Sequence, residues 1–235
     1  MPRRWNLALG SIVLLAAACV VSAAQADNPL DTPPVPFKAP PPSPMDELIA
    51  PKPAISACFT RVYDADHLRK NPKQTTTSMA VWLAYNKAAG EPPVLNPPDF
   101  GVAISRRSDS ESLFAYGGCS WDEGINRDVQ GRVLIKNFKK TVGISCMMLA
   151  RPEVFDVSSA EEGGYLILDP GKDKDTLMVY LDTGLTMVKR ADRAKQIGVK
   201  FSADDRIFML HRSAAKDCAA VEDAVTTPEP KAPGR

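Results

Sequence analysis

The segment from Cys58 to Gln74 gathers side chains that bind metals or transfer protons. Asp64, Asp66 and His67 lie within four positions, and His67 is one of only two histidines in the chain. A catalytic zinc site needs three protein ligands at fixed geometry, usually with histidines among them. One alternative is therefore a metal-dependent hydrolase that uses His67 with Asp64 and Asp66. In the competing interpretation, Asp64 or Asp66 is the N-cap of a short helix.

Other catalytic arrangements find little support in the sequence. It holds no G-x-S-x-G nucleophile motif and no glycine-rich phosphate-binding motif. His211, the second histidine, ends an alternating strand, where a structural role is expected. Paired acidic residues fall at predicted turns, where neighbouring carboxylates point into water instead of across a cleft. We therefore expect a non-enzymatic binding domain without a cofactor.

Residues 1–26 are typical of a secretory signal. Arg3 and Arg4 precede an apolar run from Leu7 to Val21, and Ala24-Gln25-Ala26 matches an A-x-A cleavage site. The run is shorter than the roughly 18–20 residues of a spanning helix, and no other segment is apolar enough, so no transmembrane segment is expected. The mature chain is expected in the periplasm of a Gram-negative bacterium or secreted.

A lesser alternative is a lipoprotein acylated on Cys19, because Leu15 to Cys19 loosely resembles a lipobox. Removal of the signal with Arg3 and Arg4 leaves 27 basic and 28 acidic residues, a net charge of about −1. A nearly neutral chain has no positive electrostatic field to attract nucleic acid, so nucleic acid is not expected as a partner. The sequence assigns no oligomeric state.

Four cysteines remain after removal of the signal: Cys58, Cys119, Cys146 and Cys218. An even number in an oxidising compartment indicates two disulfides. None lies in a C-x-x-C pair typical of redox or zinc sites. Three pairings are possible in principle. Their positions favour Cys119 with Cys146 across one hairpin, and Cys58 with Cys218 between the two ends of the domain.

Short strands separated by turn signals dominate the rest of the sequence. In residues 77–85, alternate positions carry large apolar side chains, which are Met79, Val81, Leu83 and Tyr85. Only residues 66–70 and 190–196 are expected to be helical. The predicted fold is an all-β antiparallel meander, closed as a barrel or folded as a two-sheet sandwich.

The predicted organisation has four parts. They are the signal peptide at 1–26, a proline-rich linker at 27–53, the β-rich domain at 54–218 and a disordered tail at 219–235. The linker contains ten prolines, which favour an extended chain. The tail is polar and contains prolines, so we expect it to be frayed.

The predicted binding residues are Arg61, Tyr63, His67 and Trp82. The first three lie at the exit of the first strand, where they stabilise the turn or contact a ligand. Trp82 lies on the strand face opposite Met79 and Val81. It is expected to pack in a second layer or to be exposed at a contact surface.

Two segments carry a family resemblance. Residues 58–68 with Pro72 and Gln74, and residues 204–210 with Cys218, resemble small exported proteins of proteobacteria that have no assigned activity. The resemblance spans roughly 56–218 and implies a periplasmic location without catalytic residues. We expect a periplasmic binding domain whose ligand is another envelope protein, with inhibition of an envelope hydrolase as a variant of this role.

Overall fold

The computed structural model describes residues 44–50, 52, 55–85, 99–121, 126–127, 131–140, 142–148 and 163–227 of the 235-residue chain. Within these residues the chain forms nine strands: β1 (Ser56–Val62), β2 (Thr76–Ala84), β3 (Asp99–Arg106), β4 (Leu113–Ser120), β5 (Ile144–Met148), β6 (Gly164–Pro170), β7 (Thr176–Lys189), β8 (Asp192–Lys200) and β9 (Ile207–Ser213). It also forms short helical elements: α1 (Pro44–Leu48), α2 (Ala65–Lys70), η3 (Ala203–Asp205), η4 (Ala215–Cys218) and α3 (Ala219–Thr226). The predicted all-β class is confirmed.

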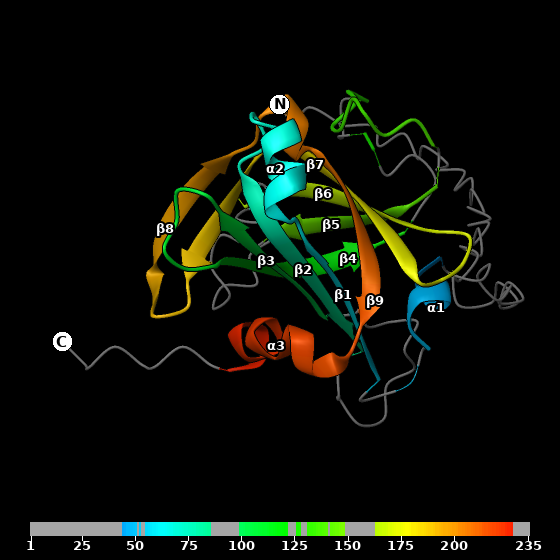
Figure 1. The fold of residues 1–235 in the computed structure, drawn as a ribbon. Helices are drawn as coiled ribbons and strands as arrows, with labels where there is room; N and C mark the ends of the chain where they lie inside the picture. Colours follow the sequence, from blue (N-terminus) through cyan, green and yellow to red (C-terminus); the bar gives the residue numbers. More distant parts are fainter. Residues whose placement is uncertain are drawn as a thin grey trace, which may run out of the picture. The chain divides into compact units, whose positions relative to one another are not determined.

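Eight of these strands close into an antiparallel barrel (Figure 1). Each strand from β1 to β6 pairs with the next one, β6 pairs with β7, β7 pairs with β9, and β9 returns to β1. Of the two predicted architectures, the barrel is therefore the one that forms. β7 has 14 residues, so its second half reaches beyond the ring to pair with β8 and with the start of β4.

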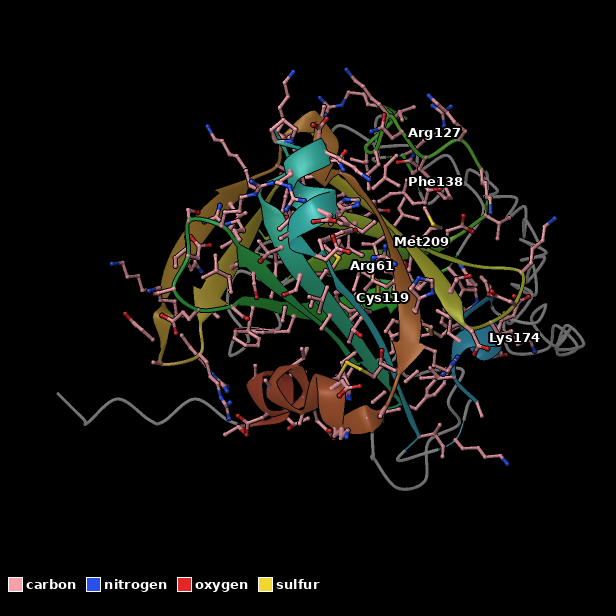
Figure 2. All side chains as sticks on the ribbon, viewed as in Figure 1. Arg61, Cys119, Arg127, Phe138, Lys174 and Met209 are labelled. Carbon is pink, nitrogen blue, oxygen red and sulfur yellow. A yellow bond between two sulfur atoms is a disulfide. The ribbon has the colours of Figure 1, made fainter. Side chains whose placement is uncertain are left out.

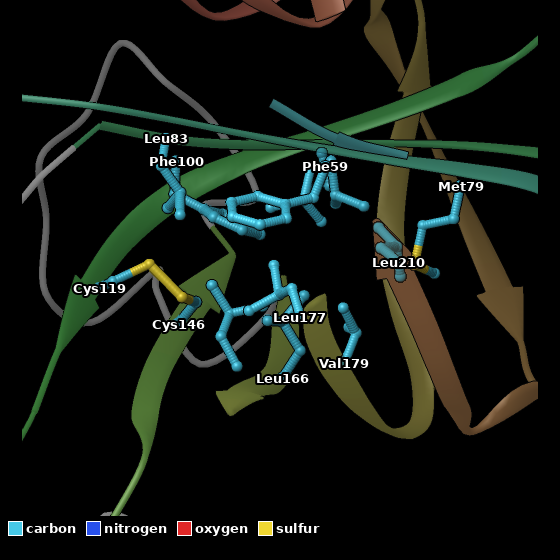
Figure 3. Close-up of a cluster of buried hydrophobic side chains, with 14 of the residues drawn as sticks. Phe59, Met79, Leu83, Phe100, Cys119, Cys146, Leu166, Leu177, Val179 and Leu210 are labelled. Carbon is cyan, nitrogen blue, oxygen red and sulfur yellow. A yellow bond between two sulfur atoms is a disulfide. The ribbon is translucent and has the colours of Figure 1, made fainter. Parts of the chain in front are cut away.

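Side chains fill the interior of the barrel (Figure 3). Met79, Val81 and Leu83 of β2 point inward, as their alternation predicted, and each is at most 1% exposed. The aromatic side chains that are fully buried in the core come from β1, β3 and β9, and they are Phe59, Phe100 and Phe208. Burial of one such side chain contributes about 1.5–3 kcal/mol. The described strands thus enclose a core of buried apolar side chains.

Helix α3 covers part of the outer surface of the barrel. Its Val221 and Ala224 are buried against an outer cluster that contains Trp82. Gly101 permits the close approach, because a Cβ atom there would lie 2.5 Å from Cγ2 of Val225. Trp82 is only 3% exposed, so it packs in a second layer and is not a surface contact residue.

The expectation of a disordered tail at 219–235 is wrong for residues 219–226, which form α3. Val221 and Ala224 lie about one helical turn apart, so they share one face. Two small apolar residues in a polar sequence are too weak a signal to predict this helix. They are buried only because the helix packs on the barrel surface. Residues 228–235 lie outside the described part of the chain.

Helix α1 covers one end of the barrel. Met45 and Leu48 are buried and belong to the interior core. Pro44 occupies the first helical position, where its missing N–H leaves no hydrogen bond unmade. The expected linker at 27–53 therefore overlaps the folded domain from residue 44 onward, and its residues 27–43 lie outside the described residues.

Arg212 ties this end of the barrel together. Its Nη2 donates to the carbonyl oxygen of Leu48 at 2.8 Å and to that of Lys174 at 3.1 Å. Its guanidinium carbon lies 4.7 Å from the ring centroid of Phe59, a cation–π contact. One side chain thus joins α1, the turn between β6 and β7, and β1.

Strand β8 replaces the helical turn that was expected at 190–196. Arg190 and Ala191 form the turn after β7, and β8 then pairs with β7. Val199 is 1% exposed in the core, opposite Leu185. Helix propensity is weak compared with the burial and pairing that this hairpin gains, so the prediction was wrong here.

Both predicted disulfides are present with the favoured pairing. Cys119 and Cys146 lie directly opposite each other on β4 and β5 and are buried in the core. Cys58 of β1 is bonded to Cys218, the last residue of η4, beside the cluster under α3. The second bridge therefore fastens α3 to the wall of the barrel.

Candidate functional site

Of all the ladders that join neighbouring strands of the barrel, the one between β1 and β9 has the fewest residue pairs. It pairs Cys58–Thr60 with His211–Ser213, and among the described residues no pair continues it. Beyond it, β9 still pairs with β7 through Ile207. We define the β1–β9 seam as Arg61–Tyr63 together with Ile207–His211. Figure 2 labels Arg61 and Met209 on the two sides of this seam.

Side chains bridge the seam where the backbone ladder has ended. Nη1 of Arg61 lies 3.1 Å from Nε2 of His211. A guanidinium only donates hydrogen bonds, so this nitrogen of His211 accepts and its imidazole is neutral. The guanidinium carbon of Arg61 lies 5.3 Å from the ring centroid of Tyr63, and the rings of Tyr63 and Phe208 are 6.3 Å apart. The seam is therefore held by an arginine between an aromatic ring and a histidine.

His67 extends this group from α2. Its ring lies 4.6 Å from the ring of Tyr63. Nε2 of His67 lies 3.0 Å from Oε1 of Gln74, while the side-chain N–H of Gln74 donates to the carbonyl oxygen of Thr76. Because the amide oxygen of Gln74 can only accept, Nε2 of His67 carries the proton. Arg61, Tyr63 and His67, predicted from one segment, thus lie together with His211.

The carboxylates beside His67 serve the helix. The backbone N–H of His67 donates to Oδ1 of Asp64 at 2.7 Å, which makes Asp64 the N-cap of α2. This hydrogen bond lowers the pKa of Asp64. Asp66 forms an ion pair with Arg69 in the next turn. In the described part of the chain no group of three histidine, cysteine or acidic side chains is placed to hold a metal, so the hydrolase alternative gains no ligand set from Asp64, Asp66 and His67.

Asp205 is fully buried close to the seam. Its two carboxylate oxygens accept from the N–H and hydroxyl of Thr75, both at 2.8 Å, and from the N–H of Thr76 at 2.9 Å. Burial alone would raise the pKa of Asp205, but these hydrogen bonds outweigh it and hold the pKa below its usual value. The ionised carboxylate therefore clamps η3 to the start of β2.

Three large apolar side chains are exposed at the seam. Val62 is 75% exposed, and Ile207 and Met209 are each 44% exposed. On the adjacent strand β7, Met178 and Tyr180 lie opposite Met209 and Ile207 and are half-buried. Beside the exposed side chains of β1 and β9, the apolar outer face therefore continues on β7 as half-buried side chains.

Two neighbouring regions of the outer surface are covered by other parts of the described chain. On one side, α3 lies over β2 and β3. On the other side, Ile135 and Phe138 are buried against Ile167 of β6, and the ring of Phe138 meets that of Tyr180 edge-on at 5.2 Å. Among the described residues no such cover lies over Val62 and Met209.

Sequence reasoning missed the exposed residues Val62, Ile207 and Met209. The available signal was the run Ile207–Leu210, which is apolar at four successive positions. Such a strand is apolar on both faces, which indicates an outer contact as well as a core. The contact between His211 and Arg61, 150 positions apart, left no signal in the sequence.

No protein-family model matches this sequence, and neither does any curated protein or solved structure. In the part of the chain that the structure describes, no helix combines the length and the hydropathy that crossing a membrane requires. The interpretation of the seam therefore depends on its own geometry.

Proposed function

We propose that this protein is a non-enzymatic binding domain that is exported to the periplasm and recognises another protein through the β1–β9 seam. The observation that carries the proposal is the exposure of Val62, Ile207 and Met209 at the place where the barrel ladder ends. Exposed apolar clusters with a polar rim are typical of protein contact sites. Arg61 and His211 supply such a rim.

Contacts elsewhere in the chain also favour binding over catalysis. The side chains with catalytic chemistry serve the fold, since His67 is hydrogen-bonded to Gln74 and Asp205 holds Thr75. All four cysteines that follow the proposed signal are in disulfides. Such bonds form in oxidising compartments, which supports export. Inhibition of an envelope hydrolase is the special case in which the partner is an enzyme.

The proposal is tested by photo-crosslinking in the cells that produce the protein. A photoreactive amino acid is placed at Val62 or Met209 of the seam, and at Val133, which is 46% exposed, as a control outside the seam. We expect the same partner protein to be crosslinked from both seam positions and not from Val133. The product should disappear when an excess of unlabelled wild-type protein competes, but persist when the competitor carries Met209→Asp.

Equal crosslinking from Val133, or competition by the Met209→Asp protein as strong as by the wild type, would contradict the proposal. So would the absence of any product from both seam positions. Mass spectrometry of the crosslinked product identifies the partner. An enzyme whose activity falls on addition of the purified domain would establish the inhibitor variant.

A further inference from the structure

We infer that the partner presents a carboxylate to Arg61, within a segment whose apolar side chains lie against Val62, Ile207 and Met209. This inference rests on the proposed function and specifies the chemistry of the partner. Its basis is the electrostatic state of Arg61 in the described part of the chain.

Arg61 is a half-buried cation whose charge is not neutralised within the described residues. No carboxylate of these residues forms an ion pair with it. Among these residues it forms a hydrogen bond to the neutral ring of His211 and a cation–π contact with Tyr63, and its buried Nε has no hydrogen-bond partner there. Leaving a cation partly desolvated without an anion is costly. A guanidinium is, however, well suited to bind a carboxylate through two parallel hydrogen bonds.

Within the described residues, three carboxylates of the neighbouring elements are already engaged. Asp205 accepts hydrogen bonds from Thr75 and Thr76, Asp64 caps α2, and Asp66 is paired with Arg69. Asp205, the buried one, cannot turn to Arg61 without leaving the N–H groups of Thr75 and Thr76 unpaired. The anion that suits Arg61 is therefore expected from a molecule that docks on the seam.

His211 holds the place that this anion would take. It is exposed on the outer face of β9, and it contacts the guanidinium of Arg61 through one neutral acceptor atom. A guanidinium forms one hydrogen bond to an imidazole nitrogen, but it can form two parallel hydrogen bonds to a carboxylate of opposite charge. An incoming carboxylate would therefore displace the imidazole with a gain in binding energy. Val62 on β1 and Met209 on β9, both exposed beyond the last ladder pair, would bury the apolar neighbours of the carboxylate.

The inference is tested with random peptides displayed on phage and selected on the immobilised full chain with its disulfides intact. We expect the selected peptides to be enriched in aspartate or glutamate next to apolar residues. One selected peptide is then synthesised with its acidic residue or with the corresponding amide. Loss of a hydrogen bond to a charged group should weaken binding about tenfold or more, measured by fluorescence anisotropy.

Four variants locate the effect. Arg61→Met should remove the difference between the acidic peptide and its amide. Val62→Asp, at a position that is 75% exposed, places a negative charge among the exposed apolar side chains of the seam and should weaken binding of the acidic peptide. Val62→Thr keeps a β-branched side chain at the same place and should bind much more tightly than Val62→Asp. Lys200→Met removes an exposed cation on β8 and should leave binding unchanged.

Selected peptides without acidic enrichment, or equal affinity for the acid and the amide, would overturn the inference. So would unchanged binding by the Val62→Asp protein, which keeps the test valid even if Arg61→Met fails to fold. Failure to select any peptide also counts against it. If crosslinking from Val62 and Met209 succeeds while these results are negative, the proposed function stands and only the carboxylate is wrong.

Discussion

Replacement of Asp205 by asparagine should destabilise the barrel far more than the same replacement at the neighbouring Asp204. Asp205 is fully buried, whereas Asp204 is exposed. The carboxylate of Asp205 accepts from the N–H and hydroxyl of Thr75 at 2.8 Å and from the N–H of Thr76 at 2.9 Å. These bonds join η3, directly before β9, to the start of β2 on the other side of β1.

The expected loss follows from the number of donors. A hydrogen bond to a charged acceptor contributes about 1.5–3 kcal/mol, and bonds that share one carboxylate are not additive. Asparagine keeps one accepting oxygen but turns an NH₂ group toward donors that need an acceptor. We therefore expect a loss of about 3 kcal/mol, which for a domain of this size lowers the melting temperature by about 6–12 °C.

Acid should remove this contribution. The pKa of Asp205 is lowered in the folded protein, because the hydrogen bonds from Thr75 and Thr76 outweigh the effect of burial. The unfolded chain, with an ordinary aspartate pKa of about 3.9, then binds the proton more readily. The stabilisation is complete above that pKa and is lost as the pH falls through the lower pKa of the folded state.

Urea unfolding followed by circular dichroism, with disulfides intact, measures the free energy of unfolding of both variants. The difference between wild type and Asp205→Asn should be large at neutral pH and shrink below about pH 4. The reasoning fails if Asp205→Asn costs less than about 0.5 kcal/mol, as an ordinary surface substitution does. It also fails if the difference does not change with pH, or if Asp204→Asn costs as much.

Three further predictions concern the layers around the core. Gly101→Val should push α3 away from the barrel, because the new Cβ would lie 2.5 Å from Val225. The melting temperature should fall and the fluorescence of Trp82 should shift to the red. Gly118→Ala, where nothing lies within 4 Å of the new Cβ, should leave both quantities unchanged. Replacing both Cys58 and Cys218 by serine should lower the free energy of unfolding by about 5 kcal/mol, and replacing both Cys119 and Cys146 by about 4, because the bridges close loops of 160 and 27 residues. A larger loss for the second pair in urea unfolding would contradict loop closure as the cause. Arg212→Met should cost about 1–3 kcal/mol, because the carbonyl oxygen of the buried Leu48 loses its donor; a cost no larger than that of Lys172→Met on the nearby turn would refute the structural role of Arg212.

The candidate site was predictable in part. Arg61, Tyr63 and His67 lie within seven positions, so residue type and spacing pointed to them. Their contacts with His211 and Phe208 depend on β9 returning to β1. Nothing local in the sequence encodes that return, since it is decided by the closure of the whole ring.

Periodicity was sufficient for the class of fold and the inward face of β2, and the positions of the four cysteines among the predicted strands favoured the disulfide pairing that forms. These features depend on the alternation of side chains along one strand and on the order of the elements. Both can be read from the order of residues along the chain. Only the tertiary structure decided that the sheet closes as a barrel, that α1 and α3 pack onto it, and that Val62 and Met209 are exposed among the described residues. Small apolar faces such as Val221 with Ala224 acquire meaning only against a partner surface, because burial is a property of two surfaces that meet and not of either segment alone.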